Sequence, residues 1–429
     1  MEAGLAEAAA VDARSEAVSP ARIFWATWTG WMLDAFDSAA YGLLLVSVWS
    51  DLLPRGGIEA SKSNIAVYGG IGFSVFVLGW AFSIFWGWLA DRIGRVRTMC
   101  ITILLYSVFT ALCGVVSGIV PFLVLRFLVG FGVGGEWAAG TPLLHESVPE
   151  SVRVRLAGWL HTAAPVGAIL ASAAALLVVP VFGWRGMFLL GLSPALLAIY
   201  LRWQTPEPHR RSRPAGFSPL RSLFTGAQAV VTWSAALMVT CGLLGVWSSS
   251  FWIPTVITTR FMAEGYPLQT AQQIASFSGL AGNLGGLGGC LIMPWLANRA
   301  ASRKLLAATL FATALIFNVV AYYWFLERLN NIVLFLAMVP LLGFLTGAPF
   351  ALFTIWLPEL FSSGTRGLGL GFTFSVGRVF AALGPLTIGT LAAGIGSYPA
   401  AITLVSMIYV LGIAFVAICR ETAGQRLPA

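Results

Sequence analysis

Two acidic residues, Asp34 and Asp37, lie in the apolar stretch 22–48. Residues three or four apart share one face of a helix, and Tyr41 follows Asp37 on that face. A charge inside a membrane is costly, and two neighbouring acids favour keeping a proton between them. We therefore expect Asp34 and Asp37 to carry an exchangeable proton. The alternative is that a neighbouring arginine neutralises both acids for structure alone.

The stretch 120–143 carries both a cation and an acid, Arg126 and Glu136. Their separation of ten residues corresponds to about 15 Å along a helix, so the two side chains cannot pair directly. We expect Asp37 or Asp34 to be the partner of Arg126, and we assign Arg126 and Glu136 to proton coupling. The alternatives are a fixed structural ion pair for Arg126 and a tie between helices for Glu136.

Arg378, in the stretch 368–390, is the only deeply placed charge in the second half of the chain. A buried cation with no acid in its own half requires an anion, and the planar guanidinium suits a carboxylate. We therefore expect Arg378 to bind the carboxylate of a substrate. The alternative is an arginine that reaches the interface or is capped by backbone carbonyls.

Other polar and aromatic residues in apolar stretches are candidates for the wall of a substrate cavity. They are Tyr41, Trp247, Trp252, Asn283 and His161. The two tryptophans suit either a cavity wall or an interfacial belt, which membrane proteins commonly carry. The imidazole could shuttle a proton, although a packing role is the alternative.

The composition predicts that these residues lie on membrane-spanning helices. Only 10% of the residues are charged, against roughly 25% in a typical soluble domain, and 58% are hydrophobic. The chain divides into twelve apolar stretches of about 20 residues, the length that crosses a bilayer. They are 22–48, 66–90, 98–118, 120–143, 156–180, 184–203, 226–257, 273–297, 304–323, 330–354, 368–390 and 397–420. The seventh is long for one crossing, and we expect Pro254 to mark its outer end.

The two halves of the chain repeat the same motifs. Residues 130–136 and 343–349 are similar glycine-rich segments, and residues 88–92 are echoed by 295–299. Parallel repeats of this kind build transporters from two bundles. We predict an all-α membrane protein with twelve transmembrane helices in two pseudo-symmetric six-helix bundles. Its expected parts are a disordered tail (1–20), a first bundle (21–203), a cytoplasmic linker (204–225), a second bundle (226–421) and a C-terminal tail (422–429).

The arrangement of basic residues predicts the orientation in the membrane. The net charge is +8, and with the N-terminus inside most of the 25 lysines and arginines fall in loops on the cytoplasmic side. Cytoplasmic loops of membrane proteins are enriched in Lys and Arg. We therefore expect both termini to be cytoplasmic and the charge to reflect topology rather than nucleic-acid binding.

Motifs for catalysis, nucleotide binding or metal binding are missing from the sequence. No GxxxxGK[ST], HExxH or GxSxG pattern occurs, and the five cysteines form no CxxC pair. We expect no enzymatic activity, no metal and no cofactor, with a proton gradient as the energy source.

Glycines and charges follow one another in the turn at 87–97, which we expect to bend sharply and to form a breakable cytoplasmic gate. Its second copy keeps Arg299 but has Asn298 in place of an acid, so we expect a weaker latch there. The alternative is a basic loop that only follows the topology rule. The predicted gate residues are Gly87, Asp91, Arg92, Gly94, Arg95, Glu146, Arg153, Arg299, Glu359 and Arg366.

These motifs resemble the major facilitator superfamily of transporters along nearly the whole chain. Residues 87–95 match its GxxxDRxGR signature. Residues 34–37 are similar to the DGxD motif of aromatic acid:proton symporters, with Ala35 in place of the usual Gly, and residues 126–137 resemble the fourth span of sialate:proton symporters. The resemblance implies import of organic anions with protons, and a proton-coupling role for the first-span acids and the fourth-span arginine. The seventh span lacks the paired glutamines of sugar porters.

The sequence therefore predicts a proton symporter that imports a small organic anion, such as a monocarboxylate, an aromatic acid or a sialate-like acid, by alternating access. We expect a monomer in the bacterial inner membrane, with protons, substrate and lipid as its partners and no nucleic acid. A proton-driven exporter of a drug or metabolite and a non-translocating, transporter-like receptor remain the alternatives.

Overall fold

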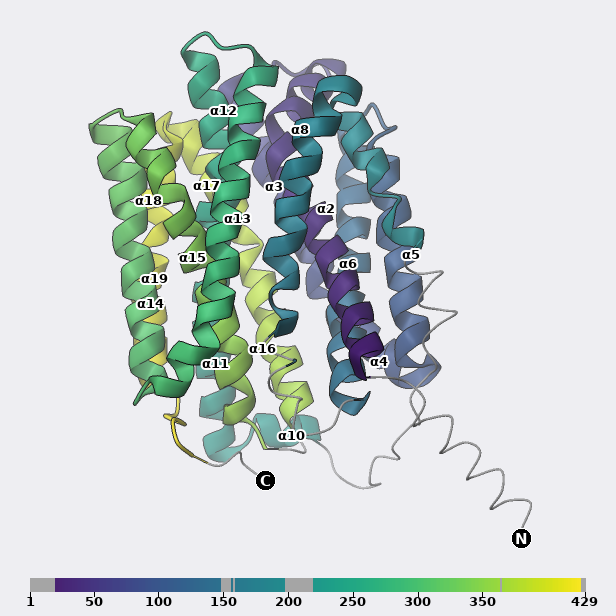
Figure 1. Cartoon of the computed structure of the whole chain (residues 1–429), viewed down its shortest axis with the longest axis vertical. Coiled ribbons are helices and arrows are strands. Elements are labelled where there is room, and N and C mark those ends of the chain that lie inside the picture. The colour runs from purple at the N-terminus through teal and green to yellow at the C-terminus, as the bar shows by residue number, and fades with distance from the viewer. Residues whose placement is uncertain (1–19, 148–155, 157–158, 197–218, 363–364, 426–429) are drawn as a thin grey trace, which may run out of the picture.

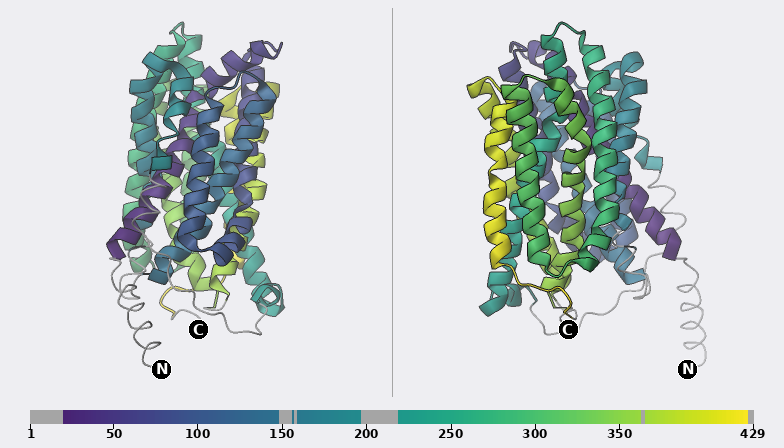
Figure 2. Two further views of the ribbon diagram at one scale, coloured as in Figure 1. Left: turned by 90° about the vertical axis from the view of Figure 1, so that its right-hand side faces the viewer. Right: turned by 60° about the vertical axis from the view of Figure 1, so that its left-hand side comes forward.

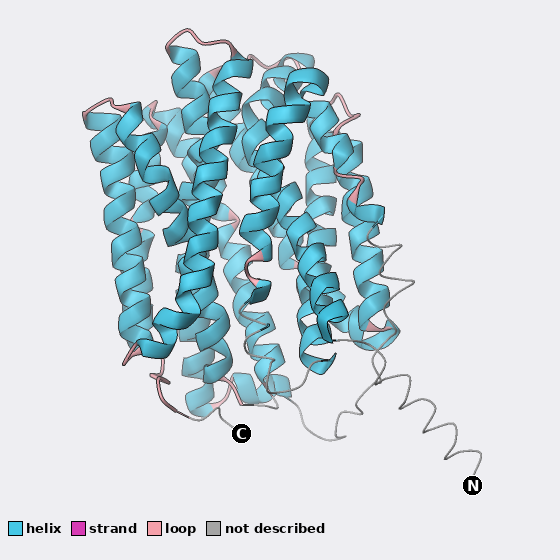
Figure 3. Ribbon diagram, viewed as in Figure 1, coloured by secondary structure: helices cyan, strands magenta, loops and turns pink. Residues whose placement is uncertain are grey.

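The computed structural model describes residues 20–147, 156, 159–196, 219–362 and 365–425. Throughout these ranges the regular structure is helical, with loops confined to the connections between helices (Figure 3). Helices suit these apolar segments because lipid offers no hydrogen-bond partner, so each backbone amide must be satisfied within its own segment.

The first half of the chain forms one group of helices. They are α2 (Pro20–Arg55), α3 (Lys62–Ala81), α4 (Ser83–Ile93), α5 (Arg95–Cys113), α6 (Ile119–Ser147) and α8 (Ala163–Leu190). The turn between α4 and α5 is made by Gly94, whose φ of 112° is readily adopted only by glycine. This matches the sharp turn expected there.

The second half forms a second group, preceded by the short helix α10 (Pro219–Leu223) at the end of the predicted linker. Its helices are α11 (Gly226–Ser249), α12 (Ile253–Ala263), α13 (Leu268–Arg299), α14 (Arg303–Asn318), α15 (Ile332–Trp356), α16 (Arg366–Ala381), α17 (Leu383–Ile395), α18 (Tyr398–Ser406) and α19 (Ile408–Ile418). Shorter 3-10 or π segments join some of them, namely η1 (Ser250–Trp252), η2 (Val319–Arg328) and η3 (Leu357–Leu360).

Eleven helical stretches in the described part of the chain are long and apolar enough to cross a membrane. One of them, 163–196, contains two crossings because Gly183 leaves the helical conformation, with φ 64° and ψ −170°. The segment after this turn returns along α5, where Gly191 faces Thr110. The described residues therefore contain these eleven stretches, and the break at Gly183 divides the fifth predicted span from the described part of the sixth, 184–196.

The seventh span differs from its prediction. Pro254 does not end the span but stands in the first turn of α12, which continues to Ala263. The interruption lies earlier, in η1, and the Tyr322 hydroxyl donates a hydrogen bond of 2.9 Å to the Ser249 carbonyl beside it. Proline is tolerated in a first helical turn because its missing N–H would be unpaired there.

The two groups of helices lie side by side (Figures 1 and 2), with α3 packed against α17 and α8 against α13. Small residues make the first of these contacts close. A Cβ on Gly70 would lie 2.6 Å from the Pro385 carbonyl oxygen, and one on Gly389 would overlap the carbonyl of Ala66. Glycine permits such an approach between membrane helices.

Candidate functional site

A cavity of about 330 Å³ lies between the two bundles. Its wall is mostly apolar and aromatic, and it receives side chains from α2, α3, α8, α11, α13, α15 and α16. The polar side chains on the wall are few. They are Asp34, Ser38, His161, Ser172, Ser250, Ser278, Asn283, Thr346 and Arg378.

Arg378 lies on α16 and reaches toward the first bundle. Its guanidinium carbon is 4.6 Å from the centre of the Trp80 ring on α3 and 5.6 Å from that of Phe374. The side chain is buried, and its Nη1 atom has no hydrogen-bond partner among the described residues. An unused guanidinium donor at an apolar cavity is a suitable anchor for a carboxylate.

Asp34 lies on the wall of the same cavity and interacts electrostatically with Arg378. It is 3% exposed, and its Oδ1 atom has no hydrogen-bond partner within the described ranges. The first bundle thus contributes an acid, and the second a cation, to one cavity.

Of the two acids proposed as partners of Arg126, Asp37 forms the ion pair, inside the first bundle and away from the cavity wall. Asp37 Oδ2 lies 3.8 Å from Arg126 Nη1, and both side chains are buried. At this distance the two atoms attract each other as charges but do not form a hydrogen bond. The pair is therefore held by charge and packing, which a proton on Asp37 would disturb.

Glu136 lies deep in the first bundle beside Gly30 of α2, where any Cβ would overlap the Glu136 carboxylate. Both of its oxygens lack a hydrogen-bond partner among the described side chains and backbone groups. As expected from its spacing, it does not pair with Arg126. It does not line the cavity either.

Two expected cavity residues lie elsewhere. Tyr41 is fully buried beside Arg126, where its hydroxyl accepts a hydrogen bond from Trp49 Nε1 (2.9 Å) and donates one to the Gly69 carbonyl (3.1 Å). Trp252 is also fully buried, with its ring 5.3 Å from that of Tyr398. Neither is on the cavity wall, because each points into packed helices.

The other expected cavity residues are on the wall. Trp247 stacks on Trp80 with ring centres 5.7 Å apart, so it belongs to the cavity rather than to an interfacial belt. Asn283 lines the cavity and donates a hydrogen bond of 2.8 Å to the Gly279 carbonyl. His161 lines it with its ring edge-on to Trp31 at 4.7 Å.

The sequence reasoning missed much of the aromatic wall. Trp31, Phe73, Trp80 and Phe251 all line the cavity, and Phe73 stacks on Phe251 with ring centres 3.9 Å apart. On α3 a signal existed, because Phe73 and Trp80 are seven residues apart and so share a helix face.

The predicted gate is only partly described. Arg153 lies outside the described residues, as do the side chains of Asp91 and Glu146. Gly87 lies within α4, and α5 begins at Arg95 directly after the Gly94 turn. The two copies of the motif place a cation on a tryptophan in the same way, with Arg92 4.0 Å from Trp88 and Arg299 4.3 Å from Trp295.

The second copy of the motif has Asn298 in place of an acid, and two acids from other parts of the chain, Glu359 and Glu421, contact the nearby Arg303. Arg303 Nη2 lies 3.2 Å from Glu359 Oε1, and the Thr422 hydroxyl donates to Glu359 at 2.5 Å. Glu421 accepts hydrogen bonds from the Ser302 hydroxyl and from the Arg303 amide. Arg366, another of the predicted gate residues, donates a hydrogen bond from Nε to the Pro358 carbonyl at 3.0 Å.

The environment of Glu421 changes its acidity. Partial burial raises its pKa, but hydrogen bonds from the Ser302 hydroxyl and from the backbone amides of Ala423, Arg303 and Lys304 outweigh this effect. The pKa of Glu421 is thereby lowered from 4.5 to about 2. The carboxylate therefore remains charged and ties the C-terminal segment to the start of α14.

No group of His, Cys, Asp and Glu side chains in the described part of the chain could hold a metal ion.

Comparison with known proteins gives a consistent result. A family model described as Major Facilitator Superfamily matches residues 27–339. A cis,cis-muconate transport protein of Acinetobacter baylyi is 28% identical over 72% of this chain and 75% of its own length. A gentisate transporter of Corynebacterium glutamicum is 27% identical over 85% of this chain and 80% of its own length. The sialic acid transporter NanX of Escherichia coli is 25% identical over 95% of this chain and 94% of its own length.

Among solved structures, a D-xylose-proton symporter superposes with a TM-score of 0.71 over 94% of this chain and 99% of its own. Its sequence is 18% identical, so this likeness concerns the fold alone.

Proposed function

Because this chain belongs to the Major Facilitator Superfamily of membrane transporters, we propose that it imports a small unsaturated or aromatic carboxylic acid together with protons. It is a multi-pass membrane protein with the fold of that family, and neither its family nor its relatives are enzymes. The substrate class, the proton coupling and the direction of transport are the proposed part.

The observation that supports an acid substrate is the Nη1 atom of Arg378, buried at the cavity without a hydrogen-bond partner among the described residues. A carboxylate would occupy this donor and balance the charge. The muconate, gentisate and sialic acid named for the relatives are all carboxylic acids.

The wall favours a flat, largely apolar body for that acid. Rings from Trp80, Trp247 and Phe73 face the cavity. The Asn283 amide, one of the few polar groups there, already donates to the Gly279 carbonyl. A polyhydroxylated acid would leave several hydroxyls unpaired in such a wall, which costs binding free energy. We therefore favour an aromatic or muconate-like acid over a sialate-like one.

Charge balance supports the role proposed for protons. Asp37 is the ion-pair partner of Arg126, while Asp34 is the acid nearest the proposed anion site. A substrate carboxylate at Arg378 would repel an ionised Asp34, so a proton on Asp34 favours substrate binding. A proton that binds to Asp37 would then remove the negative charge that faces the buried Arg126 guanidinium. Glu136 is a third buried acid that can take part.

We further propose that the protein works as a monomer in the bacterial inner membrane, with both termini in the cytoplasm and no cofactor besides the proton gradient. The basis is the distribution of lysine and arginine among the loops.

A reconstituted transport assay tests the proposal. Purified protein in liposomes is given an inward proton gradient and radiolabelled cis,cis-muconate, gentisate, benzoate or sialic acid. We expect at least one of cis,cis-muconate, gentisate and benzoate to accumulate in the liposomes. This accumulation should be lost when an ionophore collapses the proton gradient, and sialic acid should not accumulate. Accumulation of sialic acid alone, or uptake that ignores the gradient, would overturn the substrate class or the coupling.

A further inference from the structure

The buried cation Arg126 is enclosed by aromatic rings rather than by hydrogen-bond acceptors. Its guanidinium carbon lies 4.4 Å from the centre of the Tyr41 ring and 4.5 Å from that of Phe76. None of its guanidinium nitrogens has a hydrogen-bond partner in the described part of the chain. Besides the Asp37 carboxylate at 3.8 Å, the ring faces therefore decide where this cation sits.

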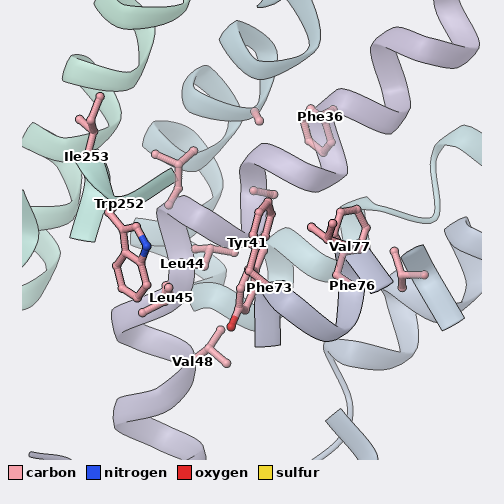
Figure 4. Packing of buried hydrophobic residues seen from close by; sticks show 14 of the residues in the cluster. Phe36, Tyr41, Leu44, Leu45, Val48, Phe73, Phe76, Val77, Trp252 and Ile253 are labelled. Atoms are coloured by element: carbon pink, nitrogen blue, oxygen red, sulfur yellow. The ribbon is translucent and has the colours of Figure 1, made fainter. Parts of the chain in front are cut away.

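Both rings lead to Phe251 of the other bundle. Tyr41 stacks on Phe251, with ring centres 6.1 Å apart and planes at 21°. Phe76 stacks on Phe73 at 5.8 Å, and Phe73 stacks on Phe251 at 3.9 Å. Figure 4 shows Tyr41, Phe73 and Phe76 close together in the core. We call these four rings, Tyr41, Phe76, Phe73 and Phe251, the aromatic clamp.

The clamp joins a rigid part of the molecule to a part where a helix is interrupted. Tyr41 is fixed by its hydrogen bonds to Trp49 and Gly69. Phe251 lies in η1, where the α-helical pattern of the seventh span stops between α11 and α12. Breaks of this kind often mark hinges. Phe73 and Phe251 also line the cavity, whereas Tyr41 and Phe76 do not.

We propose that the aromatic clamp transmits the charge state of the Asp37–Arg126 pair to Phe251 and so opens or closes the α12 end of the cavity. In the present arrangement the pair is formed and Phe251 lies on Phe73, which is the closed state. A proton on Asp37 removes the attraction at 3.8 Å, so Arg126 shifts between its two rings and the stack on Phe251 loosens. The inference rests on the proposed proton coupling and adds the route by which it acts.

Several charged or titratable groups surround Asp37 and belong to the same electrostatic unit. They are Asp34 on α2, Tyr106 and Cys113 on α5, and Arg126 and Glu136 on α6. The test therefore compares variants of the rings with a variant of Asp37 itself.

The test needs no substrate. Ala39, on the cavity wall, is replaced by cysteine in a background carrying Cys290→Ser, because Cys290 also lines the cavity. Intact cells are treated with a membrane-impermeant maleimide at acid and at neutral pH. Because only the thiolate reacts and its fraction falls with pH, each rate is divided by the rate measured at the same pH for an exposed reference cysteine, Ser63→Cys in the Cys290→Ser background. We expect this ratio to be higher at acid pH by about fivefold or more, the low end of typical coupling between sites.

Tyr41→Leu or Phe76→Leu, added to this background, should reduce the difference to below about twofold, because the cation then loses one of its rings. Tyr41→Phe should keep the difference, since it keeps the ring and loses only the hydroxyl. Phe122→Leu is the matched control, because Phe122 is a buried ring 6.2 Å from Tyr41 and Arg126 does not stack on it.

The outcomes separate the clamp from the proton pair. A pH difference that survives both Tyr41→Leu and Phe76→Leu but disappears in Asp37→Asn would overturn the clamp and leave the proposed function standing. A difference that survives Asp37→Asn would overturn the pair as the proton sensor, and the clamp with it. If Tyr41→Leu does not fold, Phe76→Leu decides alone.

Discussion

Arg378 is the residue whose loss should weaken anion binding most. Removing one partner of a buried charged contact typically costs about 2–5 kcal/mol, so Arg378→Ala should weaken binding by roughly thirtyfold or more. Arg378→Lys should recover little, because a point charge does not reproduce the planar fork. Binding of radiolabelled cis,cis-muconate or gentisate to purified protein measures both variants.

The matched control for this experiment is Arg328→Ala. Arg328 is exposed and donates hydrogen bonds to the Tyr323 hydroxyl, away from the cavity. Its loss should leave binding unchanged. Equal affinity in the unchanged protein and in both Arg378 variants would show that Arg378 only supports the bundle contact with Trp80.

Replacing Asp37 should abolish accumulation of substrate but leave its exchange across the membrane intact. Asp37→Asn mimics the permanently protonated acid, so the protein should still bind substrate and exchange it across the membrane. It should fail to accumulate substrate against a gradient, because no proton is coupled to the movement. Counterflow and gradient-driven uptake, measured in the same liposomes, make the comparison. Full accumulation by this variant would move the coupling role to Glu136 or His161.

Asp34 should behave differently, because it lies at the cavity and interacts with Arg378. Asp34→Asn removes a negative charge that competes with the substrate carboxylate. We expect anion binding to become tighter and less dependent on pH, with a smaller loss of accumulation than for Asp37→Asn. Weaker binding would indicate instead that Asp34 orients Arg378.

Among the helices, the contact between α3 and α17 makes a stability prediction. A methyl group on Gly389 would overlap the Ala66 carbonyl, whereas Gly394, on the same helix, has nothing within 4 Å of an added Cβ. Overpacking typically costs about 1–3 kcal/mol, so Gly389→Ala should lower the Tm in detergent. Gly394→Ala should leave the Tm unchanged or raise it. Equal Tm values for the two variants would mean that the helices do not approach as closely as described.

The C-terminal segment makes a prediction about pH. The folded-state pKa of Glu421 is lowered from 4.5 to about 2, so its stabilising effect is present above pH 4.5 and is lost as the pH falls toward 2. The Tm difference between the unchanged protein and Glu421→Gln should therefore be constant above that range and shrink below it. A difference that does not shrink in acid would show that ionisation of Glu421 does not contribute to stability.

For the molecule as a whole, length and hydropathy were enough to predict the membrane-spanning stretches that the structure describes, because each must cross the same apolar layer. Charge was enough to reduce the partner of Arg126 to Asp34 or Asp37, because a buried cation needs one of very few acids, and the structure selects Asp37. A helix-face argument could not separate the cavity from the bundle interior, so Tyr41 was placed wrongly. The same argument could not predict the position of Trp252 or the break at η1. Both depend on how helices distant in sequence, such as η2, pack against the seventh span.

The orientation of the whole molecule in the membrane gives the last prediction. The start of α2, the end of α19 and the short helix α10 lie at one end of the molecule (Figures 1 and 2), together with the turns that carry Arg92 and Arg299. Since basic residues favour the cytoplasmic side, this end should face the cytoplasm. Reporters fused after Arg211 and at the C-terminus should both read cytoplasmic, and one fused near Ala60 should read external. A reporter at Arg211 that reads external would reverse the molecule, place the α12 end of the cavity inside the cell, and require the maleimide in the labelling experiment to act from the opposite side.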